Sequence, residues 1–390
     1  MIKVYQIYNQ QRSMFGGEEN VINMIASLVS NNGGESKLIM KTSRGIEKSF
    51  IKKFCAFWGG VYNYPAYIEM RNLLKKDPPD VVHAHGIYPL FSPSVLVACH
   101  EMNVPVVMTV HSHILTCPTW YHLCHGNICE QCVGGHEYRC ILNNCRENAF
   151  ESIGYALRSI VARKFRLFHD NVSIIIVLTE FAKTKLINAG FREENITVVG
   201  NAISIPPVAA DPISSEYIAF AGRLSPEKGV DTLLAASSLI PHVPIRIAGD
   251  GPMVMELKRT APNNVAFVGL LDSDSLNIFY KKSRFVVVPS KCFENMSIVA
   301  IEAMGHGLPV IAAKIGGLPE IIEDGVTGLL FEPSNPEDLA IKMTVLWENP
   351  DLCREMGMAG REKAIRKYNK DDYYQKLISV YDKAIKMKHL

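Results

Sequence analysis

Two glutamates that follow an apolar run have the residue type and spacing to bind a sugar. Glu294 and Glu302 are separated by seven residues in the segment VVVPSKCFENMSIVAIEAMGHG. If a helix begins near Ser297, Glu294 lies in the loop before it and Glu302 lies on its second turn. A carboxylate accepts hydrogen bonds from vicinal hydroxyls in pairs, so one group could hold a ribose and the other a transferred sugar. Spacing alone favours the alternative, in which Glu302 is an exposed helix charge and Glu294 interacts with the helix dipole.

The start of the same helix is a candidate anion site. The first amides of a helix have no partner within it, and the helix dipole places partial positive charge there. We therefore expect the backbone of four consecutive residues to be able to bind phosphate oxygens. These residues are Asn295, Met296, Ser297 and Ile298.

A second set of candidate phosphate ligands follows the segment YIAFAGR (217–223). Gly222 and Arg223 stand at the predicted strand end, and Lys228 comes five residues later, before a helix. Arginine presents a planar fork of donors that matches two phosphate oxygens, and lysine adds a compact positive charge. The motif is consistent with a diphosphate clamp and, equally, with two solvated charges at the start of a helix.

The first half of the chain offers weaker signals. Gly16 and Gly17 follow the first predicted strand and open a helix, where backbone amides could approach a phosphate. The three spaced glycines of the dinucleotide fingerprint are missing, and a plain strand-to-helix turn explains the pair at least as well. His111 ends the predicted strand PVVMTVH (105–111). Taken alone, it is better explained as a buried histidine than as a functional one.

Six of the ten cysteines lie within residues 117–145. Cys129 and Cys132 are separated by two residues, and thiolates with this spacing can share a tetrahedral zinc ion. Cys117 and Cys140 could complete four ligands, so we predict a structural zinc site, although only one close pair is present. Free thiols and disulfides are the alternatives, and a reducing compartment disfavours disulfides. Substitute ligands in the same segment are Cys124, Cys145, His122, His125 and His136.

The elements that position these residues alternate between short Val- and Ile-rich runs and segments with helical periodicity. Near-continuous apolar runs are typical of parallel strands that helices cover on both faces. We expect two doubly wound α/β domains, residues 1–205 and 206–371, joined near the Pro-rich stretch 201–216. Ligands bind outside the carboxyl ends of such strands, and the ends of two domains can face one cleft. The predicted strands are 2–8, 36–40, 80–85, 105–111, 173–179 and 196–201, then 217–223, 243–249, 264–269, 284–290, 309–314 and 328–333.

The 390-residue chain has ordinary globular composition, with 48% hydrophobic and 21% charged residues and a net charge of +2. This excludes a disordered or coiled-coil protein and gives no electrostatic argument for nucleic-acid binding. No apolar run approaches the roughly 20 residues of a transmembrane helix, and the N-terminus lacks the pattern of a secretory signal. We expect a soluble cytoplasmic protein. The basic segment 155–169 could rest on an anionic membrane, although a solvated helix face explains it better.

The motifs AGRLSPEKGVDTLL and FENMSIVAIEAMGHGLPVIAAKIGGLPEIIEDGVTGLLFEP resemble those of the retaining glycosyltransferases of family 4, which have the two-domain GT-B fold. The similarity extends over nearly the whole chain and includes DVVHAH (80–85) and the TVH that ends at His111. It implies that a C-terminal helix, residues 372–390, packs back on the first domain. Polysaccharide-assembling relatives carry similar Cys-rich loops, matched here by Cys117, Cys129, Cys132 and Cys140.

The resemblance implies a role for each charged candidate in the second domain. Arg223 and Lys228 would neutralise the nucleotide diphosphate, whose charge grows as the glycosidic bond breaks. Glu294 would bind hydroxyls of the donor sugar, and Glu302 would bind the ribose of the nucleotide. The presence of these four residues together argues against an inactive protein.

In the first domain, the resemblance places His111 beside the donor sugar, where it would help to stabilise the transition state. It places Gly16 and Gly17 near the diphosphate or the acceptor. Ser112 stands where many relatives have an acidic residue, and it has no assigned role. The motifs contain no evident carboxylate nucleophile, and the family is thought to use front-face attack, in which the departing phosphate oxygen takes the acceptor's proton. No Asp-x-Asp motif indicates a catalytic metal.

The implied function is hexosyl transfer from a nucleotide diphosphate sugar, with a UDP-sugar as the default donor, to a saccharide acceptor in polysaccharide or glycan assembly. A lipid-linked saccharide at the inner membrane surface is one such acceptor. Two alternatives share the architecture: a nucleotide-sugar epimerase, which needs no acceptor, and an inactive glycosyltransferase-like binding subunit. A glycoside phosphorylase would need a pyridoxal phosphate lysine, and no motif identifies one.

Overall fold

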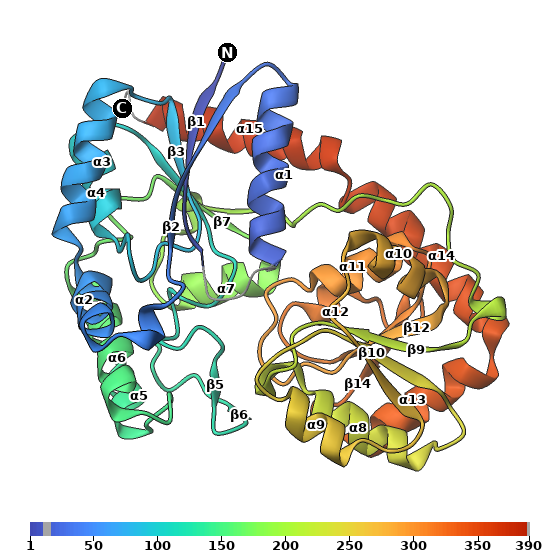
Figure 1. The fold of residues 1–390 in the computed structure, drawn as a ribbon. Coiled ribbons are helices and arrows are strands. Elements are labelled where there is room, and N and C mark those ends of the chain that lie inside the picture. The colour runs from blue at the N-terminus through green and yellow to red at the C-terminus, as the bar shows by residue number, and fades with distance from the viewer. Residues whose placement is uncertain (11–16, 388–390) are drawn as a thin grey trace. The chain divides into compact units, whose positions relative to one another are not determined.

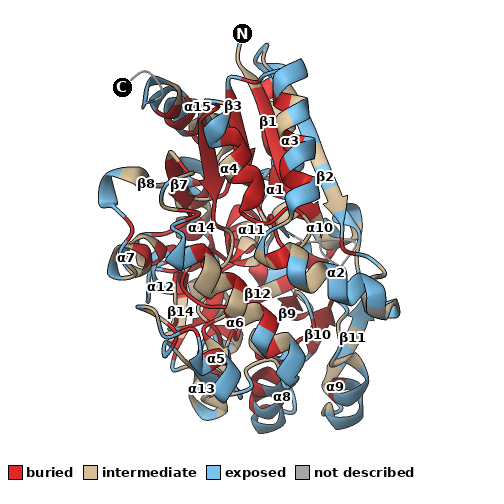
Figure 2. Cartoon of the chain, turned by 90° about the vertical axis from the view of Figure 1, so that its left-hand side faces the viewer, coloured by how far each residue is buried: buried red, intermediate tan, exposed pale blue. Residues whose placement is uncertain are grey.

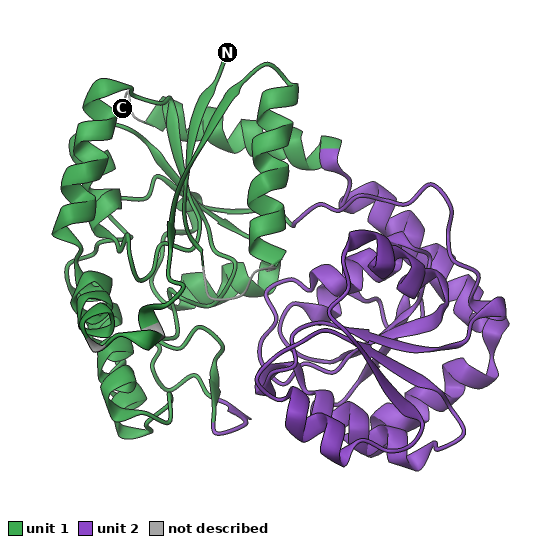
Figure 3. Ribbon diagram, viewed as in Figure 1, with its two compact units in different colours: residues 1–124, 129–200, 371–390 green, residues 125–128, 201–370 purple. Residues whose placement is uncertain are grey.

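The structure is a computed structural model that describes residues 1–10 and 17–387, apart from the side chains of Glu47 and Phe50. The chain divides into two compact units, shown in green and purple in Figure 3. Unit 1 comprises residues 1–124, 129–200 and 371–390, and unit 2 comprises residues 125–128 and 201–370. Each unit is built on a six-stranded parallel sheet flanked by helices (Figure 1).

The sheet of unit 1 has the strand order β2-β1-β3-β4-β7-β8, and every neighbouring pair is parallel. Its three central apolar strands, β3, β4 and β7, are buried at every position, because helices cover both faces of the sheet (Figure 2). The strand bounds are β1 (Lys3–Gln10), β2 (Glu35–Thr42), β3 (Val81–Ala84), β4 (Val106–Thr109), β7 (Ile174–Val177) and β8 (Ile196–Val198).

Helix α1 of unit 1 buries an apolar stripe. In α1 the residues Val21, Ile22, Ile25 and Val29 recur at helical spacing and are all buried. Helices α3 and α4 lie on one side of the sheet and α1 lies on the other (Figure 1), as right-handed crossovers on either side of β1 require. The helix bounds are α1 (Gly17–Asn31), α2 (Phe50–Val61), α3 (Tyr64–Lys76), α4 (Ser94–Glu101), α5 (Arg139–Leu142), α6 (Ala149–Lys164) and α7 (Glu180–Asn188).

A long C-terminal helix and a short hairpin accompany the two sheets and their covering helices. The C-terminal helix α15 (Lys370–Met387) places the buried Tyr381 hydroxyl 2.7 Å from His83 Nδ1 on β3, so this helix packs on unit 1. Within the cysteine-rich segment, β5 (Leu123–Cys124) and β6 (Asn127–Ile128) form a two-stranded hairpin. None of the described helices combines the length and apolar character needed to cross a bilayer.

The sheet of unit 2 has the order β11-β10-β9-β12-β13-β14, again parallel throughout. Its strands are β9 (Tyr217–Ala221), β10 (Ile245–Ala248), β11 (Val265–Gly269), β12 (Ser283–Val288), β13 (Val310–Ala313) and β14 (Gly328–Phe331). Its helices are α8 (Val230–Leu239), α9 (Val254–Thr260), α10 (Ser273–Lys281), α11 (Ile298–Gly305), α12 (Leu318–Ile321), α13 (Pro336–Glu348) and α14 (Pro350–Lys367). All twelve predicted strands are present, and the predicted fold class, two doubly wound α/β sheets, is confirmed.

Candidate functional site

The candidate site of unit 2 lies where its strand order reverses. The chain runs outward from β9 through β10 to β11, and then returns to place β12 on the other side of β9. The helices that follow β9 and β12 therefore lie on opposite faces, which leaves a crevice at the carboxyl ends of these two strands. Gly222 and Arg223 directly follow β9, and Ser290 and Glu294 follow β12. The sequence motifs of the second domain thus converge on this edge.

An ion pair between Lys228 and Glu294 is the central feature of this edge. Lys228 Nζ lies 2.6 Å from Glu294 Oε1, and the Ser290 hydroxyl donates to the same oxygen at 2.6 Å. The side chains are 33% and 11% exposed, respectively, so both charges are largely removed from water. Burial opposes the charge on Lys228, but the adjacent Glu294 carboxylate outweighs it and raises the lysine pKa above its usual value. Lys228 therefore remains charged at neutral pH.

Two glycines allow the surrounding loops to approach closely enough to form this pair. Gly229 has φ +67°, and a Cβ there would lie 1.9 Å from the carbonyl oxygen of Pro289. Gly316 has φ +60°, and its Cβ would lie 2.6 Å from the Glu294 amide nitrogen; the next amide, Gly317 N–H, donates to Glu294 O at 2.7 Å. Only glycine fits either position without a clash. The glycines thus fix Lys228 and Glu294 from two directions.

Helix α11 begins where the sequence predicts. Ser297 is its N-cap, and its hydroxyl accepts from Ala300 N at 3.3 Å. Asn295, Met296 and Ser297 are buried in the loop before the helix, and Ile298 opens its first turn at intermediate exposure. Within the described part of the chain, the amides of Ser297 and Ile298 donate to no protein acceptor. This is the arrangement of amides that binds anions at helix N-termini.

Glu302 lies on the second turn of α11, as predicted. It is partly buried, and the hydroxyl of Tyr280 on α10 donates to its Oε2 at 3.3 Å. Burial raises the pKa of Glu302 to about 7, a change that the Tyr280 hydrogen bond opposes. Tyr280 and Ser290 are the functional contacts that the sequence alone did not reveal, because the chain brings them to the glutamates only through tertiary packing.

Arg223 is exposed at the end of β9, next to Gly222, which has φ +154°. Its guanidinium makes no ion pair or hydrogen bond with the residues that the structure describes. A planar cation held at a strand end and not engaged by the protein is suited to binding an anionic ligand. The structure therefore brings Lys228 and Glu294 together and leaves Arg223 at the same strand edge.

The candidate site of unit 1 is a chain of imidazoles at the carboxyl ends of β3 and β4. His85 Nε2 lies 3.2 Å from Gln6 Oε1, and His85 Nδ1 lies 3.1 Å from His111 Nε2. Burial lowers the pKa of His111 to about 4 and holds the pKa of His85 well below its usual value, so both rings are neutral at pH 7. The sequence motif DVVHAH contains His85, but the sequence does not show that His85 contacts His111, because only the fold brings the two side chains together.

The contacts determine which nitrogen of His111 carries the hydrogen. Because Gln6 Oε1 is an acceptor, His85 Nε2 must donate to it, which leaves Nδ1 of neutral His85 as an acceptor. The His111 Nε2–H therefore donates to His85, and Nδ1 of His111 carries a lone pair. Neutral His111 thus presents a hydrogen-bond acceptor rather than a positive charge.

Gly17 is the exposed first residue of α1, and Gly16 lies outside the described residues. Next to Gly17, the carboxylate of Glu18 accepts from Gly86 N at 2.8 Å. Burial raises the pKa of Glu18 to about 7. The contact fixes the turn that follows His85, so Glu18 is a further polar residue at this edge that the sequence did not single out.

The predicted zinc ligands do not have the geometry of a metal site. In the described ranges, no group of three or more His, Cys, Asp or Glu side chains is arranged to hold a metal ion. All ten cysteines are free thiols, and the sulfurs of Cys124 and Cys145 are 3.5 Å apart. Cys132 and Cys140 are buried against Ala156, and Cys117 is buried as well. Cys129, in contrast, is partly exposed. Zinc binding by these cysteines stays a prediction.

Of the four basic residues in the segment 155–169, only Arg158 is buried, and the other three (Arg163, Lys164 and Arg166) are exposed, as a solvated helix face requires. Helix α6 spans Ala149–Lys164, and Arg158 is 6% exposed, with its Nη2 donating to Pro118 O at 2.8 Å. Arg163 pairs with Glu137 at 2.6 Å. Three aromatic rings surround the Arg158 guanidinium: Tyr88, Trp120 and Tyr155. Arg158 thus departs from the solvated face expected for this segment, because aromatic and carbonyl partners compensate its burial.

Comparisons with known proteins agree with this architecture. The family model Glycosyltransferase Family 4 matches residues 15–205, and the model Glycosyl transferases group 1 matches residues 207–363. An uncharacterized glycosyltransferase of Methanocaldococcus jannaschii is 26% identical over 314 residues, which cover 78% of this chain and 76% of the relative. The sulfoquinovosyl transferase of Arabidopsis thaliana is 27% identical over 306 residues, or 73% of this chain and 53% of that protein.

The solved structure of Anabaena Alr3699/HepE in complex with UDP and glucose superimposes with a TM-score of 0.71 at 19% identity. The match covers 98% of this chain and 100% of that protein, so the two share their fold over their whole lengths. The paired carboxyl-edge sites and the two family models lead to one conclusion. The chain belongs to glycosyltransferase family 4, has the GT-B fold, and is a glycosyltransferase that transfers a sugar from a nucleotide sugar.

Proposed function

We propose that the protein transfers a hexose from a UDP-sugar, with retention of configuration, to a saccharide acceptor in polysaccharide or glycan assembly. The observation that carries the proposal is the buried Lys228–Glu294 pair at the edge of the unit 2 sheet, beside the start of α11. The cation and the helix amides match the negatively charged phosphates of such a donor, and the carboxylate matches its hydroxyls. Unit 2 is then the donor-binding unit, and unit 1 binds the acceptor.

The diphosphate would bind to Arg223, Lys228 and the first amides of α11. The Lys228 ammonium has three hydrogens and uses one on Glu294, so it can donate to phosphate oxygens without leaving its partner. Arg223 offers a fork of donors to two further oxygens. These groups stabilise the charge that develops on the diphosphate as the bond to the sugar breaks.

The two glutamates would bind the two sugars of the donor. Ser290 and Lys228 fix Glu294 through one oxygen, and because a carboxylate has about four lone-pair sites, it can also accept from hydroxyls of the transferred sugar. Glu302 would accept from the ribose hydroxyls, with Tyr280 orienting its carboxylate. The complex of Alr3699/HepE with UDP-glucose, a protein of the same fold, supports uridine diphosphate as the carrier.

His111 would accept a hydrogen bond from a sugar hydroxyl through Nδ1, because its Nε2–H is directed at His85. It stays neutral and does not act as the acid. In the proposed front-face reaction, the acceptor oxygen forms a bond to the anomeric carbon as the bond to the diphosphate breaks. The acceptor's proton passes to the departing phosphate oxygen, so no protein nucleophile is needed.

The acceptor is a saccharide, and a lipid-linked saccharide at the inner membrane surface is the form we favour. The neutral imidazole of His111, oriented by His85, suits recognition of uncharged hydroxyls. Neither a catalytic metal nor nucleic acid has a role in the proposal.

The test is the substitution Glu294→Ala, with Glu256→Ala on the exposed surface of α9 as the matched control. Glu294→Ala should lower the rate of sugar transfer from a UDP-sugar by at least about 100-fold, while circular dichroism shows a folded protein. The control should keep full activity. Undiminished transfer in Glu294→Ala would remove the site.

Two outcomes with the wild-type protein would favour the alternatives. Chromatography that shows conversion of the nucleotide sugar without an acceptor would indicate an epimerase. Calorimetry that shows no binding to any of a panel of nucleotide sugars would indicate an inactive binding subunit.

A further inference from the structure

Helix α2 exposes large apolar side chains to an unusual extent. Ile51 is 73% exposed, Phe54 51% and Trp58 53%. These residues recur at positions i, i+3 and i+7, so they share one side of the helix. The first half of α2, residues 51–55, is exposed, and exposed residues are pale blue in Figure 2. An apolar face left in water in this way indicates an interaction site.

The exposed face continues onto helix α6. Phe57 on α2 stacks on Phe150 with 4.7 Å between ring centroids and 27° between planes. Phe57 also lies against Gly154, where a Cβ would come within 2.7 Å of its ring. Phe150 and Ile153 are themselves exposed. We name this continuous surface, made of Ile51, Phe54, Trp58, Phe150 and Ile153, the α2 face.

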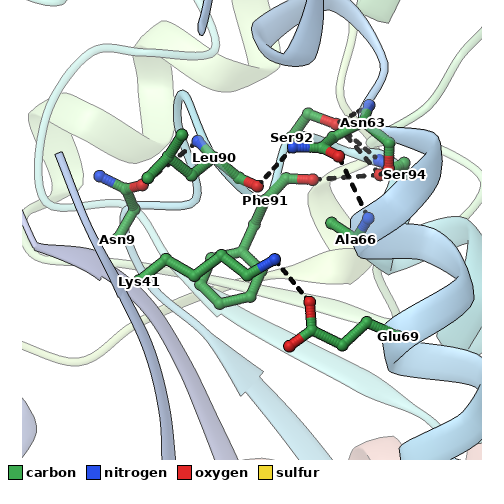
Figure 4. Close-up of polar contacts among 9 residues, drawn as sticks. All are labelled: Asn9, Lys41, Asn63, Ala66, Glu69, Leu90, Phe91, Ser92 and Ser94. Carbon is green, nitrogen blue, oxygen red and sulfur yellow. Dashed lines mark hydrogen bonds and ion pairs between the residues drawn. The ribbon is translucent and has the colours of Figure 1, made fainter. Parts of the chain in front are cut away.

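Both ends of α2 are fixed to the rest of unit 1. At its start, the Ser49 hydroxyl accepts from Lys52 N at 3.4 Å and caps the helix. Beyond its end, Asn63 donates from its backbone to Ser92 Oγ at 2.9 Å and from its side chain to Leu90 O at 2.7 Å (Figure 4). The apolar side chains therefore stand on a held helix rather than on a loose segment.

The same anchor connects α2 to the carboxyl edge of the unit 1 sheet. Leu90 N donates to the side chain of Asn9, near the end of β1, at 3.2 Å (Figure 4). The loop that contains Leu90 also follows His85 and Gly86, which belong to the unit 1 site. A surface held by α2 would thus be coupled to the loops that we assign to the acceptor.

The chain segment that forms α2 carries positive charge. Residues 44–61 contain four basic residues and one acidic residue, a net charge of +3, whereas the whole chain has +2. Lys52 and Lys53 lie on α2 itself, both exposed, and neither pairs with a carboxylate of the described residues. The other two basic residues are Arg44 and Lys48.

We propose that the α2 face rests on the surface of an anionic lipid bilayer. Exposed Phe, Trp and Ile side chains flanked by lysines are the combination by which helices bind in the plane of such a surface. The apolar side chains would enter the acyl boundary, and the lysines would reach the phosphates of the headgroups. The inference deepens the proposed function, because a protein held there meets a lipid-linked acceptor.

The first experiment is flotation with vesicles of phosphatidylcholine that contain about 30% phosphatidylglycerol. The wild-type protein should float with these vesicles, and much less with pure phosphatidylcholine. The pair Phe54→Ser and Trp58→Ser should reduce the bound fraction at least about tenfold. The matched control is Met255→Ser with Leu270→Ser, two exposed apolar residues of unit 2, which should bind as the wild type does.

A charge variant and a spectroscopic measurement guard against misfolding. Lys52→Glu with Lys53→Glu should weaken binding to the anionic vesicles and reduce its salt dependence. In a protein that keeps Trp58 and has the other two tryptophans, Trp120 and Trp347, replaced by Phe, the emission of Trp58 should shift to the blue when vesicles are added. An unchanged emission, or equal flotation of the Phe54→Ser/Trp58→Ser protein, would overturn the proposal.

A second copy of this chain is the competing occupant of the α2 face. Sedimentation equilibrium that shows a dimer, lost in the Phe54→Ser/Trp58→Ser protein, together with no flotation of the wild type, would also overturn it. Failure here is separable from failure of the proposed function. Calorimetric binding of UDP depends on unit 2 and should be unchanged in every α2 variant.

Discussion

The carboxyl edges of the two sheets carry opposite kinds of polar group. In unit 2, a buried ion pair between Lys228 and Glu294 stands beside the exposed cation Arg223. In unit 1, the corresponding edge carries His85 and His111, whose low pKa values make them neutral. The same type of sheet thus provides an edge with an ion pair, which we call the charged edge, and an edge with neutral histidines, which we call the uncharged edge although Glu18 lies beside it. A departing diphosphate needs charge compensation, whereas hydroxyls need only oriented donors and acceptors.

The largest expected effect comes from breaking the ion pair of the charged edge. Lys228→Ala leaves the Glu294 carboxylate largely buried without its cation, so it should destabilise unit 2 by about 2 kcal/mol and lower transfer at least about 100-fold. Urea unfolding and initial rates measure the two effects. The double substitution Lys228→Ala with Glu294→Gln should recover stability and not activity; recovery of both would contradict a role in donor binding.

The next effect comes from the uncharged edge. His111→Ala should lower kcat by about 100-fold with little change in UDP affinity, because the imidazole contacts hydroxyls and not phosphates. His100→Ala, an exposed histidine at the end of α4, is the matched control. A rise in the Kd for UDP as large as the fall in kcat would show that His111 also contributes to UDP binding. Phosphate binding and hydroxyl contact would then not be separated between the two edges.

The pH dependence should differ between the edges. Since the pKa of His111 is about 4, its protonation contributes no change in activity between pH 5 and 8. Glu302, with a pKa of about 7, must be ionised to accept from a ribose. Its ionised fraction rises about tenfold between pH 6 and 8, so UDP affinity should rise by up to that factor. The carboxylate faces Tyr280 on α10, with His306 adjacent to that ring.

Titration calorimetry at several pH values measures this change. Glu302→Gln should bind UDP more weakly at pH 8 and lose the rise in affinity. A profile that is unchanged in this variant would assign the dependence to another group.

The sequence predicted the strands of both sheets and the start of α11 because these depend on local signals. Apolar runs bounded by turn residues mark strands, and Ser297 is a favoured N-cap. Glu294 and Lys228 were each identified as candidates by type and by resemblance. Their pairing was not, because they lie 66 positions apart in the sequence and only the order of β9 and β12 in the sheet brings them together.

Other features depend on packing that no short pattern encodes. Arg158 has the sequence context of a surface charge, and the three aromatic rings around it come from distant segments. The contact of His85 with His111 joins two strands. The exposure of Phe54 and Trp58 is likewise invisible in sequence, where both resemble core residues. The zinc prediction for the cysteines can be tested by metal analysis. One zinc per chain would confirm it, and the absence of zinc would contradict it.

The most direct test of the central claim is a calorimetric titration of UDP into the wild-type protein and into Arg223→Ala and Lys228→Ala. If the charged edge of unit 2 binds the diphosphate, as we propose, each substitution should raise the Kd at least about tenfold. Uridine, which lacks the phosphates, should bind to the three proteins with similar affinity. Equal affinity of all three for UDP would place the diphosphate elsewhere and contradict the account.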